Sequence, residues 1–410
     1  MQKIVWGIIA LVLFIPNKQN VVYAQNTPKA VTEVPIYTDC QNYNNKLSAI
    51  ASSIDFIPID ENPLLNDFHI INIEICDEYF FLSGMDFIYQ YKKDGTFVKT
   101  IGRRGNGPKE YINIIGPLGL DCSRKLIYAH DVNRNRVVIY DYNGTFKGTF
   151  PLSGSKSAQL ISSEIMALRQ SISDRELSNV QKIDFLDTEG KKIRSISSHV
   201  YPIDKDKKDN LGPDMSPMWS NGANTYYLEY GTDTIFRISG TSLIAERILS
   251  GKLKSNVEEH YSNSKGKKLN IVMPILRFNS GVFESNRFMI FRLSNDYETF
   301  FMVYDKNTGR LQRTFYENAP RTFRGPKKKE GPKKHDCFID DMISGLSFNP
   351  EYQSNGKAIA LISASDICEK RKDILDFIDK HPSEKSKKLR GVIQNMTEED
   401  NSLMMVVGFK

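Results

Sequence analysis

Apolar and polar residues alternate in short segments along most of this chain, and many of these segments occur in pairs joined by a glycine turn. Such alternation is typical of strands with one buried face, and the residues before each glycine favour a tight hairpin. The turn glycines are separated by 49, 46, 50 and 69 residues, which indicates a repeat. The five hairpins are FIYQYKKDGTFVKTIG, VVIYDYNGTFKGTF, IDFLDTEGKKIRSI, TIFRISGTSLIAERIL and FMVYDKNTGRLQRTF, with turn glycines Gly95, Gly144, Gly190, Gly240 and Gly309.

A further short apolar segment precedes each hairpin and extends the repeat to three or four strands. These segments are YFFLSG, KLIYAH, EIMALRQ, TYYLEYG and RFMIFRLS, and HIINIEI and IIGPLGL supply an innermost strand in the first two units. A unit of this kind about every fifty residues describes the blades of a β-propeller. Strands do not alternate with amphipathic helices, which argues against a parallel α/β fold.

The two ends of the chain supply the strands that would close the ring. KLSAIASSIDFIPID (46–60) reads as a strand without a partner nearby, and SGLSFNP, KAIALISA and SLMMVVGFK supply strands near the C-terminus. An open ring would leave a sheet edge exposed. We therefore predict an all-β, six-bladed propeller over 46–410, closed by the N-terminal strand in the C-terminal blade. One short amphipathic helix is expected over 366–381, with helical spacing of Ile367, Ile374, Leu375 and Ile378.

The N-terminus has the features of a secretory signal peptide. The apolar run IVWGIIALVLFI follows a basic residue, and VVYA places Val22 and Ala24 before a cleavage site. An uncleaved anchor is the alternative, but a membrane span needs about 20 apolar residues. No later run is that long, and no cysteine stands at the cleavage site. We predict a signal peptide over 1–24, an N-terminal extension over 25–45, and a periplasmic or extracellular protein with neither lipid anchor nor transmembrane segment.

Positive charge is concentrated in one segment. The formal net charge is +6, and the chain after residue 24 has 53 basic and 49 acidic residues. RTFRGPKKKEGPKK (321–334) contains seven of these basic residues and one acidic residue, so the rest is close to neutral. This distribution and the signal peptide argue against a nucleic-acid partner. We expect a basic loop over 320–335, either solvated or docked on an acidic surface.

Cysteine and histidine show no metal-binding pattern. The five cysteines are Cys40, Cys76, Cys122, Cys337 and Cys368. Their spacing excludes a zinc ribbon or a thioredoxin-like motif, and in an oxidising compartment they could form one or two disulfides, with at least one thiol left over. The six histidines form no HExxH or HxH group. We predict no cofactor, with Ca²⁺ in the channel as an alternative that no motif supports.

Three segments resemble a known family. They are IDFIPIDENPLL, YKKDGTFVKTIGRRGNGPKEY and EEDNSLMMVVGFK. Together they are similar to the secreted six-bladed β-propellers of Bacteroides-type bacteria, which are related in outline to NHL-repeat and TolB-like propellers. Many members look like lipoproteins, unlike this chain. The resemblance implies a fold more firmly than an activity. The second segment matches the family pattern at Gly102, Gly105, Gly107, Pro108, Glu110 and Tyr111.

The segment IGRRGNGPKEY (101–111) contains three glycines but does not match a nucleotide-binding loop. Gly102 and Gly107 have P-loop spacing, but Pro108 occupies the lysine position, and Glu110 replaces the third glycine of GxGxxG. We interpret the segment as the crossover from the outer strand of the first blade to the inner strand of the second. Its glycines would permit a tight path.

This crossover would share one face of the propeller with the loops between second and third strands. That face would be rich in arginine and would suit a polar or anionic ligand through bidentate contacts. Solvated loop tips are the alternative. The candidate ligand-binding residues at this channel mouth are Arg103, Arg104, Lys109, Asp131, Arg134, Arg136, Arg175, Asp233 and Asp296.

Two classes of function remain after the nucleic-acid class is set aside. A binding or scaffolding module needs only the ring and its loops. A propeller lyase, hydrolase or lactonase would need channel carboxylates around a metal, or a histidine-based acid/base pair. The histidines are scattered along the sequence, so no catalytic role can be assigned to any of them. We predict a monomeric cell-envelope module that binds a polar or anionic small molecule, a glycan or an envelope protein and is linked to glycan utilisation, with the metal-dependent enzyme as the alternative.

Overall fold

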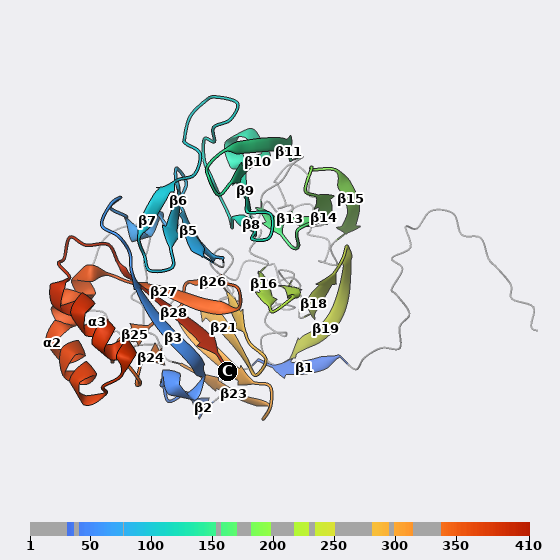
Figure 1. Cartoon of the computed structure of the whole chain (residues 1–410). Helices are drawn as coiled ribbons and strands as arrows, with labels where there is room; N and C mark the ends of the chain where they lie inside the picture. The colour runs from blue at the N-terminus through green and yellow to red at the C-terminus, as the bar shows by residue number, and fades with distance from the viewer. Residues whose placement is uncertain are drawn as a thin grey trace, which may run out of the picture.

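The computed structural model shows a six-bladed β-propeller, which confirms the fold predicted from the repeat (Figure 1). The first strand of each blade lies beside the central channel, and later strands lie progressively farther out. The structure describes residues 31–36, 41–76, 78–152, 157–169, 182–197, 217–228, 234–250, 281–294, 299–314 and 338–410. The predicted signal peptide and the basic tract lie outside these residues.

The first three blades each use four consecutive strands. Blade 1 contains β4 (Asn72–Ile75), β5 (Tyr79–Ser83), β6 (Ile88–Lys92) and β7 (Phe97–Thr100). Blade 2 contains β8 (Gly119–Asp121), β9 (Leu126–Asp131), β10 (Arg136–Asp141) and β11 (Phe146–Pro151). Blade 3 contains β12 (Ser157–Leu160), β13 (Ile165–Arg169), β14 (Lys182–Asp187) and β15 (Lys192–Ser197). Successive strands of each blade pair antiparallel.

Blades 4 and 5 each gain a fifth, outermost strand from the N-terminal segment. Blade 4 contains β16 (Met218–Asn221), β17 (Asn224–Leu228), β18 (Thr234–Ser239) and β19 (Ser242–Ser250). Blade 5 contains β20 (Val282–Glu284), β21 (Phe288–Ser294), β22 (Thr299–Asp305) and β23 (Arg310–Arg313). β1 (Thr32–Pro35) pairs parallel with β19, and β2 (Gln41–Asn42) pairs parallel with β23. The segment expected as a simple extension therefore adds strands to two blades.

Blade 6 closes the ring with strands from both ends of the chain. It contains β26 (Tyr352–Ser354), β27 (Lys357–Ile362), β28 (Leu403–Phe409) and β3 (Ala51–Pro58). β3 pairs antiparallel with β28, so the predicted closure is confirmed. Met404 and Val406 pack against blade 1, whereas Met405 and Val407 belong to the core shared with blade 5. Because both faces of β28 are buried, its sequence is a continuous apolar run.

The predicted turn glycines all have positive φ. Gly95, Gly144, Gly190, Gly240 and Gly309 have φ of 95°, 81°, 89°, 57° and 67°. Gly95 shows why a side chain is excluded at this turn, because an added Cβ would lie 1.7 Å from the carbonyl oxygen of Pro58 at the end of β3. The hairpin of blade 1 therefore packs directly on the closing strand.

Two helices lie between β27 and β28, where the sequence analysis expected only one. α2 (Ala364–Lys380) begins at the N-cap Ser363, and α3 (Glu384–Asn395) begins at a capping box formed by Ser383 and Ser386. Ile367, Ile374 and Ile378 of α2 pack with Leu389 and Ile393 of α3 on the core of blade 6. α3 was missed because few apolar residues mark its buried side. No helix in the described ranges is long and apolar enough to span a membrane.

Short elements complete the connections. β24 (Phe338–Ile339) and β25 (Ser347–Phe348) form a separate two-stranded sheet near the helices. The 3₁₀ turns are η1 (Leu47–Ala49), η2 (Asp67–His69) and η3 (Val132–Arg134). η3 forms the turn between the second and third strands of blade 2 and thus positions the arginines discussed next.

Candidate functional site

The glycine-rich segment 101–111 connects β7 of blade 1 to β8 of blade 2. Glu110 folds back onto it: its Oε2 accepts a hydrogen bond from the Gly107 amide at 2.7 Å, and Arg103 pairs with Oε1. These contacts, first the amide bond and then the arginine, hold the pKa of the Glu110 carboxyl below its usual range. A Cβ on Gly105 would lie 2.0 Å from Glu110 Oε2, so the glycine is what lets the carboxylate reach this position.

Three of the predicted mouth residues hold this crossover from blade 2. Arg134 donates from Nη1 to the carbonyl oxygens of Gly107 at 3.1 Å and Glu110 at 2.9 Å. Arg136 donates to the Pro108 carbonyl at 3.0 Å and pairs with Asp131 at 3.2 Å. The fully buried Asp131 carboxylate also accepts from the backbone amide of Ile112. These side chains are engaged within the protein.

The other predicted mouth residues fall into two groups. The Arg103 side chain is 80% exposed, the Arg104 side chain is 57% exposed and lies 3.8 Å from Asp86, and Lys109 is exposed. These three cations lie close together in the chain, on one crossover. Arg175, Asp233 and Asp296 lie outside the described residues. A binding role for this set stays a prediction.

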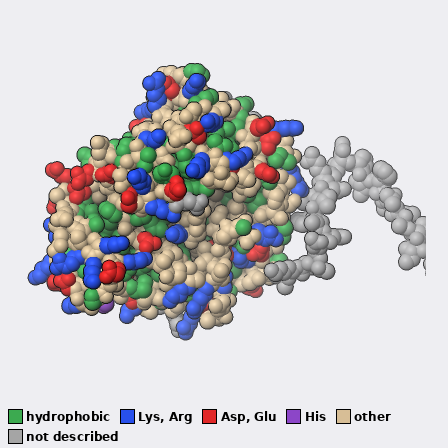
Figure 2. Space-filling view, viewed as in Figure 1, with side chains coloured by type: hydrophobic (Ala, Val, Ile, Leu, Met, Phe, Trp, Pro, Cys, Tyr) green, Lys and Arg blue, Asp and Glu red, His purple; other side chains and the backbone are tan. Residues whose placement is uncertain are grey.

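Charge on the visible face is mixed. In the view of Figure 2, Lys and Arg side chains are interspersed with Asp and Glu side chains, and apolar side chains lie between them. This face therefore carries small clusters of either charge, and neither a basic nor an acidic patch dominates it.

A polar cavity lies in the central channel, at a place that the sequence analysis did not predict. Its volume is about 160 Å³, and residues of the inner strands β4, β8, β12, β16 and β26 line it. Apolar walls come from side chains such as Leu118, Leu160 and Trp219. The crossover leads into the start of β8, whereas Cys122 on the cavity wall follows the end of β8. The crossover and this wall therefore lie toward opposite ends of the channel.

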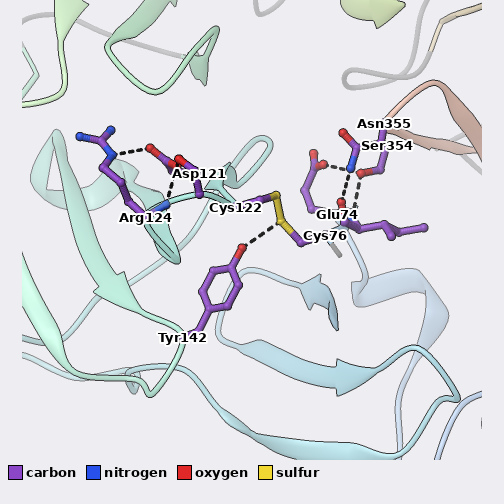
Figure 3. Close-up of a disulfide and its surroundings, with 10 residues drawn as sticks. Glu74, Cys76, Asp121, Cys122, Arg124, Tyr142, Ser354 and Asn355 are labelled. Carbon is purple, nitrogen blue, oxygen red and sulfur yellow. Dashed lines mark hydrogen bonds and ion pairs between the residues drawn. A yellow bond between two sulfur atoms is a disulfide. The ribbon is translucent and has the colours of Figure 1, made fainter. Parts of the chain in front are cut away.

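Glu74 is the acidic side chain of the cavity. Its Oε1 accepts from Asn72 Nδ2 at 3.1 Å, and its Oε2 accepts from the Ser354 hydroxyl at 2.8 Å. The Ser354 oxygen in turn accepts from the Ile75 amide at 2.7 Å, which fixes its orientation (Figure 3). Burial among neutral groups raises the pKa of Glu74 to about 7, and the two hydrogen bonds only partly offset this effect. Near neutral pH the carboxyl can therefore gain or lose a proton.

Two amide oxygens of the cavity wall receive no hydrogen bond from the residues that the structure describes. Gln159 Oε1 on β12 and Gln353 Oε1 on β26 are buried and accept no hydrogen bond from the described part of the chain. The orientation of Gln353 is fixed because its Nε2 donates to the Ser220 carbonyl at 3.2 Å. A buried acceptor without a donor costs about 1–3 kcal/mol, so these oxygens favour a bound donor group.

A disulfide forms part of this end of the channel. Cys76 and Cys122 join the turns that follow β4 and β8, with their Cα atoms 5.9 Å apart, and the Tyr142 hydroxyl donates to Cys76 Sγ at 3.0 Å (Figure 3). The bridge links blade 1 to blade 2. Cys368 is a free thiol, and Cys40 and Cys337 lie outside the described residues.

Metal binding was left open by the sequence. Among the residues that the structure describes, no group of three or more His, Cys, Asp or Glu side chains is placed to hold a metal ion. The expectation of no cofactor, with Ca²⁺ as the alternative, stays a prediction.

The polar signal that could have indicated the cavity is short. Asn72 and Glu74 occupy alternate positions of HIINIEI, and Gln353 and Ser354 occur in a three-residue strand. Alternation alone assigns such residues to one face of a strand. It does not show that this face lines a channel.

Comparison with known proteins agrees with the fold. Residues 31–408 match the family described as "Domain of unknown function (DUF4934)". A structure titled "Putative exported protein" from Bacteroides fragilis is similar over 92% of this chain and 100% of that chain, with 17% identity and a TM-score of 0.65. A member of the DUF4221 family from Bacteroides vulgatus covers 66% of this chain and 86% of its own, with 13% identity and a TM-score of 0.42. The comparison with curated proteins gives no match.

Proposed function

We propose that this chain, which belongs to the DUF4934 family, is an exported binding protein of the cell envelope whose central channel holds a small polar ligand. The observation that carries the proposal is the polar cavity of about 160 Å³. A cavity of roughly this volume holds a benzene-sized molecule in another protein. The wall combines several polar side chains with a few apolar ones, and placed polar groups fix the orientation of a ligand in such a pocket. One sugar ring or one amino acid has a suitable size.

Export is supported by three observations. The sequence begins with a signal-peptide pattern, the similar Bacteroides fragilis protein is described as exported, and the Cys76–Cys122 disulfide suits an oxidising compartment. We place the protein in the periplasm or outside the cell, as a monomer linked to glycan utilisation. Arg103, Arg104 and Lys109 remain proposed contacts to a larger ligand or an envelope protein at the other end of the channel.

A channel-blocking variant tests the proposal. Ser220→Phe places a ring on the cavity wall, whereas Ser163→Phe places the same ring on the exposed β12–β13 turn. We expect saturation-transfer NMR of the chain from residue 25, with a panel of monosaccharides and amino acids, to detect a compound that binds wild type and S163F but not S220F. Absence of any binding compound, or equal binding to S220F, would contradict a channel site.

A further inference from the structure

Five side chains of the cavity wall already donate hydrogen bonds within the protein. Asn72 Nδ2 donates to Glu74, Gln353 Nε2 to the Ser220 carbonyl, and Asn355 Nδ2 to the Ile75 carbonyl at 2.6 Å. The indole of Trp219 donates to Glu284 at 2.7 Å, and the hydroxyl of Ser354 donates to Glu74. A ligand that needs any of these five donors would have to displace one of these bonds.

Acceptors on the same wall are still open. The buried oxygens of Gln159 and Gln353 lack donors within the described ranges, and they come from blades 3 and 6, on opposite sides of the ring (Figure 1). Glu74 accepts only two hydrogen bonds from described side chains, whereas a carboxylate offers about four acceptor positions. The cavity therefore presents oxygen atoms from several directions and suits a ligand rich in donors.

Two glutamates of the inner strands, the fully buried Glu284 and the partly buried Glu74, differ in their charge partners. Glu284 of β20 lies 2.6 Å from Lys306 Nζ and 2.9 Å from Arg247 Nη2, so its charge is compensated. Glu74 has hydrogen bonds from the neutral side chains of Asn72 and Ser354. Burial disfavours the ionised form of a carboxyl group, and a cation beside it stabilises that form. An ammonium group in the cavity would supply that cation.

We propose that the channel site selects ligands that carry a primary ammonium group, with the Glu74 carboxylate as counter-ion and the amide oxygens of Gln159 and Gln353 as further acceptors. This inference rests on the proposed function, because it names the ligand class of the same cavity. An amino sugar or an amino acid side chain with a terminal amine meets these requirements. An anionic ligand does not, because it would lie against a carboxylate and against acceptor oxygens.

Proton linkage follows from the same geometry. Besides Glu74, the wall contains one tyrosine and one cysteine. Tyr352 of β26 donates its hydroxyl to the Ile70 carbonyl, and Cys122, just after β8, is in the disulfide and does not titrate. The wall residues on β12 and β16 carry no ionisable group. Because the pKa of Glu74 is about 7, its ionised fraction increases between about pH 6 and pH 8. An alkyl ammonium stays charged over this range, so its affinity should increase with pH.

Three probes of one shape test the inference by isothermal titration calorimetry. They are 4-aminocyclohexanol, cyclohexane-1,4-diol and 4-hydroxycyclohexanecarboxylate, which differ in one group that is cationic, neutral or anionic. At about pH 7.5 we expect the amine to bind wild type at least about tenfold more tightly than the diol, which is a modest value for a charge-assisted hydrogen bond. The carboxylate should bind most weakly.

Glu74→Gln supplies the matched variant, since it keeps the shape and removes the charge. We expect E74Q to weaken amine binding about tenfold or more and to leave diol binding unchanged. Glu384→Gln makes the same change on an exposed side chain of α3 and should alter neither. The increase in amine affinity with pH is measured on wild type and requires no variant. In E74Q this increase should disappear, and cooperative unfolding like that of wild type shows that E74Q is folded.

The outcomes separate the two proposals. Tighter binding of the diol or the carboxylate in the S220F-sensitive cavity would overturn the ammonium selectivity and retain the channel site. Amine binding that is independent of pH in wild type would also overturn it. If none of the three probes binds, the selectivity is refuted, and the compound panel then decides the channel site by itself.

Discussion

Met405 lies opposite Phe56 in the sheet of blade 6, although the two residues come from opposite ends of the chain. Met405 is fully buried in the core shared by blade 5, blade 6 and the two helices. This pair belongs to the ladder that joins β28 to β3 and closes the ring. A closed ring leaves no face of a blade without a neighbour. The stability of every blade therefore depends on the pairing of β28 with β3.

Removal of either closing strand should prevent cooperative folding. Deletion of residues 401–410 or 46–60 removes several buried apolar side chains, each worth about 1.5–3 kcal/mol, and together these approach the stability of a whole domain. We expect neither truncated protein to show a single sharp unfolding transition in urea. If both truncated proteins unfold as cooperatively as wild type, the closure is refuted.

A point substitution tests the same contact more gently. Met405→Ala should lower the free energy of unfolding by about 2–5 kcal/mol, because it leaves a cavity in the core. Met85→Ala makes the same change at a side chain that is 48% exposed and should cost less than about 0.5 kcal/mol.

The disulfide should stabilise the junction of blades 1 and 2. It closes a segment of 46 residues, for which chain-entropy arguments give about 4 kcal/mol as an upper value. We expect the double variant Cys76→Ser with Cys122→Ser to unfold at lower urea concentration, by about 2–4 kcal/mol. Cys368→Ser provides the comparison, since Cys368 is a free thiol. Dithiothreitol should lower wild-type stability and leave the double variant unchanged.

The arginines near the crossover should differ in their effect on stability. Arg136→Ala leaves the fully buried Asp131 carboxylate without its closest cation, and we expect a loss of about 3 kcal/mol. The double variant Arg103→Ala with Arg104→Ala removes exposed side chains and should stay within about 1 kcal/mol of wild type. Urea unfolding measures both.

Binding then separates the roles of the exposed pair. If Arg103 and Arg104 contact a ligand at this mouth, the double variant should fold normally and bind a polar or anionic ligand more weakly. Loss of folding in this variant would instead assign both side chains to the path of the crossover.

Glu74 should make wild type less stable as pH rises. The folded pKa of about 7 exceeds the ordinary value of 4.5, so the folded protein holds this proton over a range in which the unfolded chain has lost it. The stabilisation is complete below about pH 4.5 and is lost by about pH 7, and it amounts to at most about 3 kcal/mol.

Comparison with E74Q isolates this contribution from other carboxyl groups, several of which titrate in the opposite direction. The stability of E74Q minus that of wild type, from urea unfolding at pH 5 to 8, should increase with pH. A constant difference would show that Glu74 titrates normally.

Sequence patterns located the hairpins and the closing strands because these depend on local turns and on alternation along one strand. They did not locate the cavity. Gln159 and Gln353 lie in different blades, and only ring closure places them on one channel. The mouth arginines show the same limit. The sequence does not distinguish Arg103 from Arg136, yet the Arg103 side chain is exposed to water and the Arg136 side chain donates to the backbone of the crossover.

The sequence by itself therefore determined the propeller, its six blades, the joining of its ends and the glycine-rich crossover. Each of these follows from hydrophobic periodicity or from the conformations that glycine permits. Only the tertiary structure decided which polar groups are satisfied, which cysteines pair and which carboxylate has no cation beside it among the described residues. Such properties depend on distances between blades that are far apart in sequence, and hydrogen bonding and burial act through those distances.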